Sequence, residues 1–126
     1  MSNTRYTEDH EWVRVEDDDI AVVGITDFAQ DQLGELVYVE LPETGSTVSR
    51  GDNAAVIESV KAAGEVKSPV SGRIEAVNDT LSDAPETVND DPTGAGWFYK
   101  VRISDAGELE GLMDEDAYAA HIKDLA

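Results

Sequence analysis

The chain has 126 residues, of which 28 are acidic and 9 basic, so its formal net charge is −19. This length is typical of one domain, and so acidic a surface disfavours nucleic acids and anionic membranes as partners. The sequence has no cysteine, which excludes disulfides, thiolate metal sites and a cysteine nucleophile.

The first part of the chain alternates short apolar runs with turn signals. We expect a loose tail over residues 1–5, after which "HEWVRVE" and "IAVVGIT" predict two strands joined by an acidic turn. "TDFAQDQLG" predicts a short helix near residues 27–33, with Thr26 as its N-cap and Gly34 after its last turn. "ELVYVELP" predicts the next strand.

The second part begins with a predicted hairpin. "NAAVIESV" and "AAGEVK" predict strands on either side of a tight turn that holds Lys61, and a turn at Pro69–Gly72 leads to a further strand. "DTLSDAPETVNDDPTGAG" predicts mainly loop with one helical turn, and "WFYKVRIS" predicts the last strand. Apolar residues at helical spacing over residues 104–126 predict one or two short helices folded back on a β core that spans residues 6–103.

Many short strands with close turn signals and few long helices favour a small β sandwich or barrel with added helices. We therefore predict a mainly β fold, built as a single domain over residues 1–126.

The sequence contains no stretch close to the roughly 20 apolar residues that a membrane-spanning helix needs. "MSNTRYTEDHEW" lacks the apolar core of a secretory signal, and its acidic residues argue against an organelle transit peptide, so we predict a cytoplasmic location. The acidic runs at Glu16–Asp19 and Asn89–Pro92 are expected to be solvated faces. The large excess of carboxylates suggests a salt-adapted source, because concentrated salt screens their repulsion.

Lys61 is one of only four lysines, and it lies at the tip of the predicted hairpin. A lysine on a β turn is ordinarily a solubilising residue. Here small residues follow it, in "KAAG", which would let the active site of another protein close around an amine that projects from the body. This arrangement suits a covalent attachment site, because an exposed lysine keeps its charge and needs an enzyme to modify it.

The segment "ESVKA" resembles the lipoylation motif of the glycine cleavage system H protein family. Seven further segments resemble the family in the family's order, and together they cover nearly the whole chain after the first five residues. They are "YTEDHEWV", "VGITDFAQDQLGE", "VYVELPETG", "SPVSG", "VNDTL", "NDDPTGAGW" and "LMDEDAYAAH".

The resemblance implies a barrel-sandwich hybrid fold like that of lipoyl domains, and a non-enzymatic shuttle without catalytic or metal-binding residues. Lys61 would carry lipoate in amide linkage, and Glu58, Ser59, Val60 and Ala62 would be read by the lipoate-attaching enzyme. The arm would take an aminomethyl group from the pyridoxal-phosphate-dependent glycine decarboxylase to the tetrahydrofolate-dependent aminomethyltransferase. Dihydrolipoyl dehydrogenase, a flavoenzyme that uses FAD, would then reoxidise the arm, and the carrier itself is expected to be a monomer.

The resemblance also implies a cleft that shelters the loaded arm from water. When this chain is matched to the family position by position, the candidates for this cleft are Glu11, Glu65 and Asp9, because a cationic amine favours carboxylate partners. The alternative for each is a solvated surface carboxylate. Relatives often have Asp where Glu65 stands and a small hydroxyl residue where Asp9 stands. His10 is expected to be a structural, hydrogen-bonding histidine.

Four alternatives remain open from the sequence. The chain could be another lipoyl or biotinyl carrier domain, although such domains usually have an acidic residue or Met before the lysine, where this chain has Val60. It could relay lipoyl or octanoyl groups to other proteins. An enzyme is disfavoured because no Ser/His/Asp set or Gly-rich phosphate loop stands in a convincing context. The last alternative is a halophilic interaction domain with an unmodified Lys61.

Overall fold

The computed structural model describes residues 4–16 and 19–125. Two antiparallel sheets dominate the described part, one of six strands in the order β1-β2-β3-β9-β8-β5 and one of three strands in the order β4-β6-β7. The strands are β1 (Thr4–Tyr6), β2 (Glu11–Val15), β3 (Ile20–Ile25), β4 (Leu36–Glu40), β5 (Thr47–Val48), β6 (Asn53–Ser59), β7 (Ala63–Lys67), β8 (Gly72–Val77) and β9 (Tyr99–Ile103). The helices are α1 (Asp27–Leu33), α2 (Thr80–Asp83), α3 (Thr87–Asp90), the 3₁₀ helix η1 (Ala106–Gly111) and α4 (Glu115–Leu125). The predicted mainly β fold with a helical C-terminal segment is confirmed.

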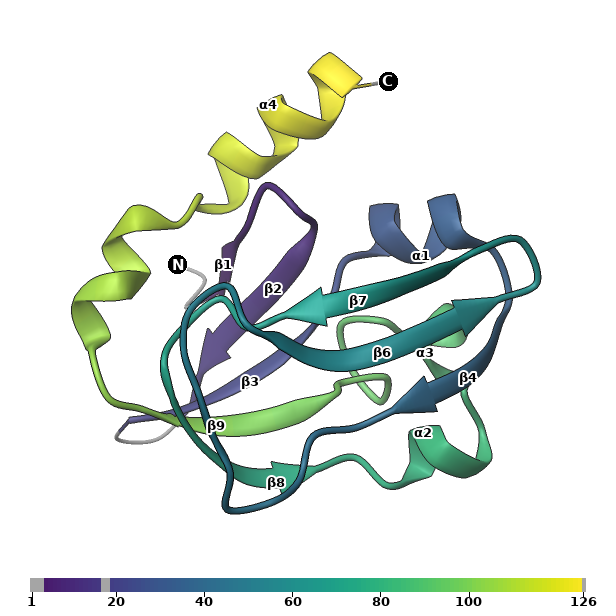
Figure 1. Ribbon diagram of the computed structural model, residues 1–126. Coiled ribbons are helices and arrows are strands. Elements are labelled where there is room, and N and C mark those ends of the chain that lie inside the picture. The colour runs from purple at the N-terminus through teal and green to yellow at the C-terminus, as the bar shows by residue number, and fades with distance from the viewer. Residues whose placement is uncertain (1–3, 17–18, 126) are drawn as a thin grey trace.

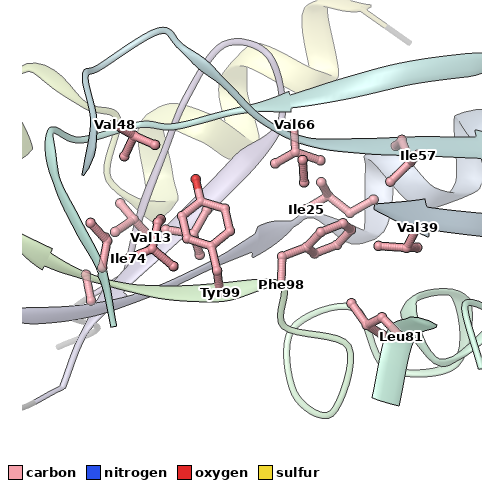
Figure 2. Packing of buried hydrophobic residues seen from close by; sticks show 14 of the residues in the cluster. Val13, Ile25, Val39, Val48, Ile57, Val66, Ile74, Leu81, Phe98 and Tyr99 are labelled. Atoms are coloured by element: carbon pink, nitrogen blue, oxygen red, sulfur yellow. The ribbon is translucent and has the colours of Figure 1, made fainter. Parts of the chain in front are cut away.

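Alternation along the strands places the core between the two sheets. In β9, Tyr99, Val101 and Ile103 are buried while Arg102 is exposed, which is the period of two expected of a half-buried strand. Figure 2 shows Tyr99 and Phe98 in the middle of the buried cluster. Val13, Ile25 and Ile74 from the large sheet surround them, together with Val39, Ile57 and Val66 from the small sheet.

The helix predicted near residues 27–33 is α1, and its ends are capped as the sequence indicates. The Thr26 hydroxyl accepts a hydrogen bond from the Ala29 amide, and Gly34 ends the helix with a φ of 81°. On α3, the Asn89 side chain donates to the carbonyl of Gly34 (2.8 Å) and accepts from the amide of Leu36 (2.9 Å). Asn89 therefore fixes the connection between α1 and β4.

Two expectations from the sequence were wrong, and one strand was missed. Residues 4 and 5 are not part of a loose tail, because they belong to β1, which pairs with β2 and whose last residue, Tyr6, forms mutual backbone hydrogen bonds with Met113. The segment after β8 contains two short helices instead of one. The short strand β5 was not expected, because its two residues are too few to show a periodic pattern.

The two acidic runs are solvated only in part. In the second run, Asp90 and Asp91 are exposed but Pro92 is buried. In the first run, Glu16 forms an ion pair with Lys100 (N–O distance 3.3 Å), whereas residues 17 and 18 of the same run lie outside the described residues. Among the helices of the described part, none is long and apolar enough to cross a membrane.

Candidate functional site

Lys61 lies at the tip of the hairpin formed by β6 and β7, which extends to the vicinity of α1 (Figure 1). The last regular pair of the hairpin joins Glu58 to Ala63. The Ser59 amide then donates to the Ala62 carbonyl (2.7 Å), which leaves Val60 and Lys61 as the residues at the tip. The side chain of Lys61 is exposed.

The hydroxyl of Ser59 organises this turn. It accepts hydrogen bonds from the amides of Lys61 (3.2 Å) and Ala62 (3.0 Å), and it donates to the carbonyl of Ala62 (3.1 Å). One donor and two acceptor positions are the full capacity of a serine hydroxyl. Two-residue hairpin loops commonly need residues with positive φ, and neither Val60 nor Lys61 has one. Ser59 therefore supplies through its side chain the turn geometry that glycine or asparagine would otherwise provide.

The C-terminal end of α1 supports the turn from the side. The amide of Val60 donates to the carbonyl of Glu35 (3.1 Å). The stem of Lys61 passes close over Gly34, since a Cβ atom at Gly34 would lie 2.8 Å from Cε of Lys61. The base of the lysine is thus held in place while the side chain as a whole remains exposed.

A pocket of about 390 Å³ lies at the other end of β7. Its walls come from the turn between β1 and β2, the turns on either side of the β6–β7 hairpin, the segment before α4, and α4 itself. Among the residues that line it are Asp9, Glu11, Lys67, Met113 and His121. From Ala63 to Lys67 the strand advances by four residues, or about 13 Å at roughly 3.3 Å per residue.

Glu11 contributes a buried carboxylate to this pocket, with only 3% of its surface exposed. Its oxygens accept hydrogen bonds from the Thr7 hydroxyl (2.7 Å) and the Lys67 amide (3.3 Å). Burial raises the pKa of Glu11, and these two hydrogen bonds oppose that rise in part because they stabilise the charged form. A cation entering the pocket would offset the cost of keeping this carboxylate ionised.

The chain matches a model of one protein family over residues 4–125, and that family is described as "Glycine cleavage H-protein". The chain belongs to this family. It is 58% identical over 125 residues to the glycine cleavage system H protein of Rhodospirillum rubrum, and the match covers 99% of both chains. It is 56% identical over 121 residues to the corresponding protein of Marinobacter nauticus, with 96% of this chain and 93% of the relative covered. The crystal structure of a glycine cleavage system H protein from Mycobacterium marinum superposes with a TM-score of 0.88 at 39% identity, covering 98% of each chain.

The structure brings together two of the three residues that the sequence analysis predicts for a cleft. Asp9 and Glu11 both line the pocket, and the Thr7 hydroxyl accepts hydrogen bonds from the backbone amides of both. Glu65 is not among the lining residues. It is exposed on β7, opposite Val56 and two residues before Lys67, so it lies between the tip of the hairpin and the pocket.

His10 stands between the pocket residues Asp9 and Glu11 in the sequence, and its ring belongs to an aromatic cluster with Phe28, Tyr118 and His121. Its Nδ1 atom lies 2.8 Å from the hydroxyl of Tyr118 on α4, which in turn lies 2.7 Å from the Thr26 hydroxyl. Its ring centroid is 5.8 Å from that of His121. Burial, and secondarily the nearby His121, lower the pKa of His10, while Asp9 opposes this shift. The expectation of a hydrogen-bonding histidine is confirmed.

Several residues of the pocket were not found from the sequence. Thr7 stands four residues before Glu11, and this spacing across a tight turn was a local signal that could have indicated the contact. His121 and Met113 come from the distant C-terminal segment, for which no local signal exists. The hydroxyl of the fully buried Tyr99 has no hydrogen-bond partner among the described residues, and the Ser68 hydroxyl donates to the Val70 carbonyl (2.6 Å).

Proposed function

We propose that this chain is the lipoyl-bearing carrier of a glycine cleavage system, with lipoate attached to Lys61 in amide linkage. The observation that carries the proposal is the exposed Lys61 at a braced hairpin tip, in a chain that belongs to the glycine cleavage H-protein family. The carrier takes an aminomethyl group from glycine decarboxylase to the tetrahydrofolate-dependent aminomethyltransferase and is then reoxidised by dihydrolipoyl dehydrogenase. Tethering gives each transfer a high effective concentration.

The residues at the tip fit a covalent lipoyl group. Among the described residues, ion pairs join Lys100 to Glu16 and Arg102 to Glu75. The amine of Lys61 therefore forms no ion pair with a carboxylate of the described part. Ala62 and Ala63 are small and exposed, which leaves room for an approaching enzyme. When bound, lipoate supplies a disulfide that can be reduced to a dithiol and can carry the one-carbon cargo.

The pocket at the far end of β7 supports a second part of the proposal, the sheltering of the cargo amine. Glu11 receives the amine, because its buried carboxylate gains a cationic partner and already has its other hydrogen bonds fixed by Thr7 and Lys67. Asp9 adds negative charge at the rim. Glu65 is proposed to attract the amine along the exposed face of β7.

The attachment site is tested by intact mass spectrometry after incubation with a lipoate–protein ligase, lipoate and ATP. We expect one lipoyl mass increment on the native chain, none on Lys61→Arg, and one on the matched control Lys67→Arg, which changes a lysine of the same hairpin. Lys61→Arg should fold normally and fail to support glycine–bicarbonate exchange by the decarboxylase. A native chain without the increment, or an increment that persists in Lys61→Arg, would refute the carrier function.

The shelter is tested by loading the lipoylated protein with the aminomethyl group and measuring ammonia release without tetrahydrofolate. Glu11→Gln should release ammonia several times faster than the native protein, since the neutral amide cannot pair with the cargo amine. Glu43→Gln, an exposed change distant from the pocket, is the control. Equal rates of ammonia release in all three proteins would refute the proposed role of Glu11. The assignment of Lys61 as the attachment site would not be affected.

A further inference from the structure

Exposed apolar side chains gather beside Lys61. The large apolar residues that are exposed in the described part of the chain are Val37 (51%), Tyr38 (45%) and Val60 (65%). Val60 is the neighbour of Lys61, and Val37 and Tyr38 lie on the adjacent strand β4. We refer to these three residues as the tip patch. Exposed apolar groups that cluster at one place indicate a surface that another molecule covers.

A β-bulge in β4 creates the tip patch. Leu36 pairs with Ser59, and Tyr38 pairs with the next residue back, Glu58, so Val37 is an extra residue without a partner on β6. In a regular strand, Val37 and Tyr38 would point to opposite faces and one of them would enter the core. The bulge instead leaves both exposed. Bulges often serve to redirect side chains next to functional sites.

Val60 joins the tip patch to Lys61, and Tyr38 lies opposite Glu58, three residues before Lys61. The hydrogen bond from the Val60 amide to the Glu35 carbonyl joins the hairpin tip to the start of β4. Glu35, Glu40 and Glu58 are all exposed around the apolar residues. The result is an apolar centre with an acidic rim, which complements a partner with an apolar surface and basic side chains around it.

We propose that the tip patch is the docking surface for the enzyme that attaches the lipoyl group to Lys61. This inference rests on the proposed function. In the attachment reaction, Nζ of Lys61 attacks the acyl carbon of a lipoyl adenylate. The C–N bond of the amide forms, the C–O bond to the phosphate of AMP breaks, and the amine loses its proton to solvent.

The geometry of that reaction favours the attaching enzyme over the other partners as the protein that covers the tip patch. The attaching enzyme must bring its acyl carbon within bonding distance of Nζ, so its surface covers the residues immediately around Lys61. An enzyme that acts on the far end of the finished arm can bind farther away, by up to the length of the arm. A second copy of this chain would present the same acidic rim, and the like charges would oppose that contact.

The test compares rates of lipoylation by a lipoate–protein ligase at saturating lipoate and ATP. The variant Val37→Thr/Val60→Thr keeps the shape and strand preference of valine and replaces one methyl group by a hydroxyl at each position. We expect its kcat/KM for the apo protein to fall by roughly tenfold, the effect of losing one good interface contact, with most of the change in KM. Tyr38→Thr should act in the same direction. Thr47→Ser, at an exposed position of β5, should have the rate of the native chain.

The second arm uses the same variants after prolonged incubation has lipoylated them completely. They should support glycine–bicarbonate exchange at the native rate, because the decarboxylase works at the far end of the arm. An unchanged kcat/KM for lipoylation would overturn the docking proposal and leave the carrier function intact. Loss of exchange equal to the loss of lipoylation would also overturn it, because the patch would then serve the decarboxylase. Failure of the native chain to be lipoylated would overturn both proposals, and thermal unfolding verifies that each variant is folded.

Discussion

Gly34 couples the end of α1 to Lys61, and its replacement by alanine tests this part of the structure most directly. Its backbone angles, φ 81° and ψ −161°, lie in a region that residues with a Cβ atom almost never occupy. Holding alanine there costs about 1–3 kcal/mol. The new Cβ atom would also lie 2.8 Å from Cε of Lys61, but the lysine stem is flexible and exposed and can move away at little cost. We therefore expect Gly34→Ala to lose about 2 kcal/mol of stability and to displace the Lys61 side chain.

Urea unfolding measures the loss of stability. With a slope of about 2 kcal/mol per molar urea, a loss of about 2 kcal/mol lowers the midpoint by roughly 1 M without changing the slope. The displacement of Lys61 is measured separately, as a lower kcat/KM for lipoylation under conditions in which the variant is fully folded.

Alanine substitutions at two other glycines are controls that distinguish the effect of backbone strain from the effect of the contact with Lys61. Gly51 also has a positive φ, 91°, but a Cβ atom there would meet no other atom within 4 Å. Gly51→Ala should therefore also lose stability, through backbone strain alone, and keep the native lipoylation rate. Gly64, on β7, has ordinary backbone angles, and its Cβ atom would lie 3.8 Å from Ile57, so Gly64→Ala should be neutral or slightly stabilising. The reasoning is refuted if Gly34→Ala unfolds at the native midpoint.

Three further predictions concern the turn, the histidine cluster and the surface charge. Ser59→Ala removes three hydrogen bonds from the hairpin tip and should cost about 1 kcal/mol and slow lipoylation, whereas Ser46→Ala, which removes one bond to the Glu43 carbonyl in a distant turn, should leave lipoylation unchanged. The lowered pKa of His10 means that the unfolded chain binds the proton more tightly, so stability should fall as pH drops below about 6.5 toward the folded pKa. Glu11, whose pKa is raised, opposes this fall. His10→Asn, which tolerates the φ of 72°, should show a smaller loss between pH 7.5 and 5.5 in urea unfolding, and an equal loss would contradict the assignment to His10. The net charge of −19 predicts greater stability in multimolar KCl than at low salt, and higher stability at low salt would exclude the proposed salt adaptation.

The hairpin and its lysine could be predicted from the sequence because their determinants are local. Two short apolar runs flank a small polar stretch, and Ser59 stands within the turn that it organises through hydrogen bonds to residues two and three positions away. The same holds for α1, whose cap Thr26 and terminal Gly34 bracket the helix. Periodicity and turn chemistry act over a few residues, so they remain visible in a single sequence.

The bulge in β4 was not visible in this way. "ELVYVELP" has four apolar residues in a row, so its pattern predicts a strand without assigning its faces, and whether Val37 faces the core or the solvent depends on the register with β6. The location of Glu65 relative to the pocket also depends on how its strand is placed in the sheet. Its position four residues after Lys61 is evident, while its separation from the pocket follows from the direction and face of β7.

By itself, the sequence determined the mainly β class, the hairpin tip with Lys61, the capped helix α1 and the acidic surface, because each depends on composition or on neighbouring residues. Only the tertiary structure decided where the pocket lies. The backbone bonds between Tyr6 and Met113, and the contact of His10 with Tyr118 across 108 residues of sequence, bring the C-terminal segment against the start of the chain. Such contacts form because distant apolar and polar groups complement each other after folding, and no pattern within either segment specifies its partner.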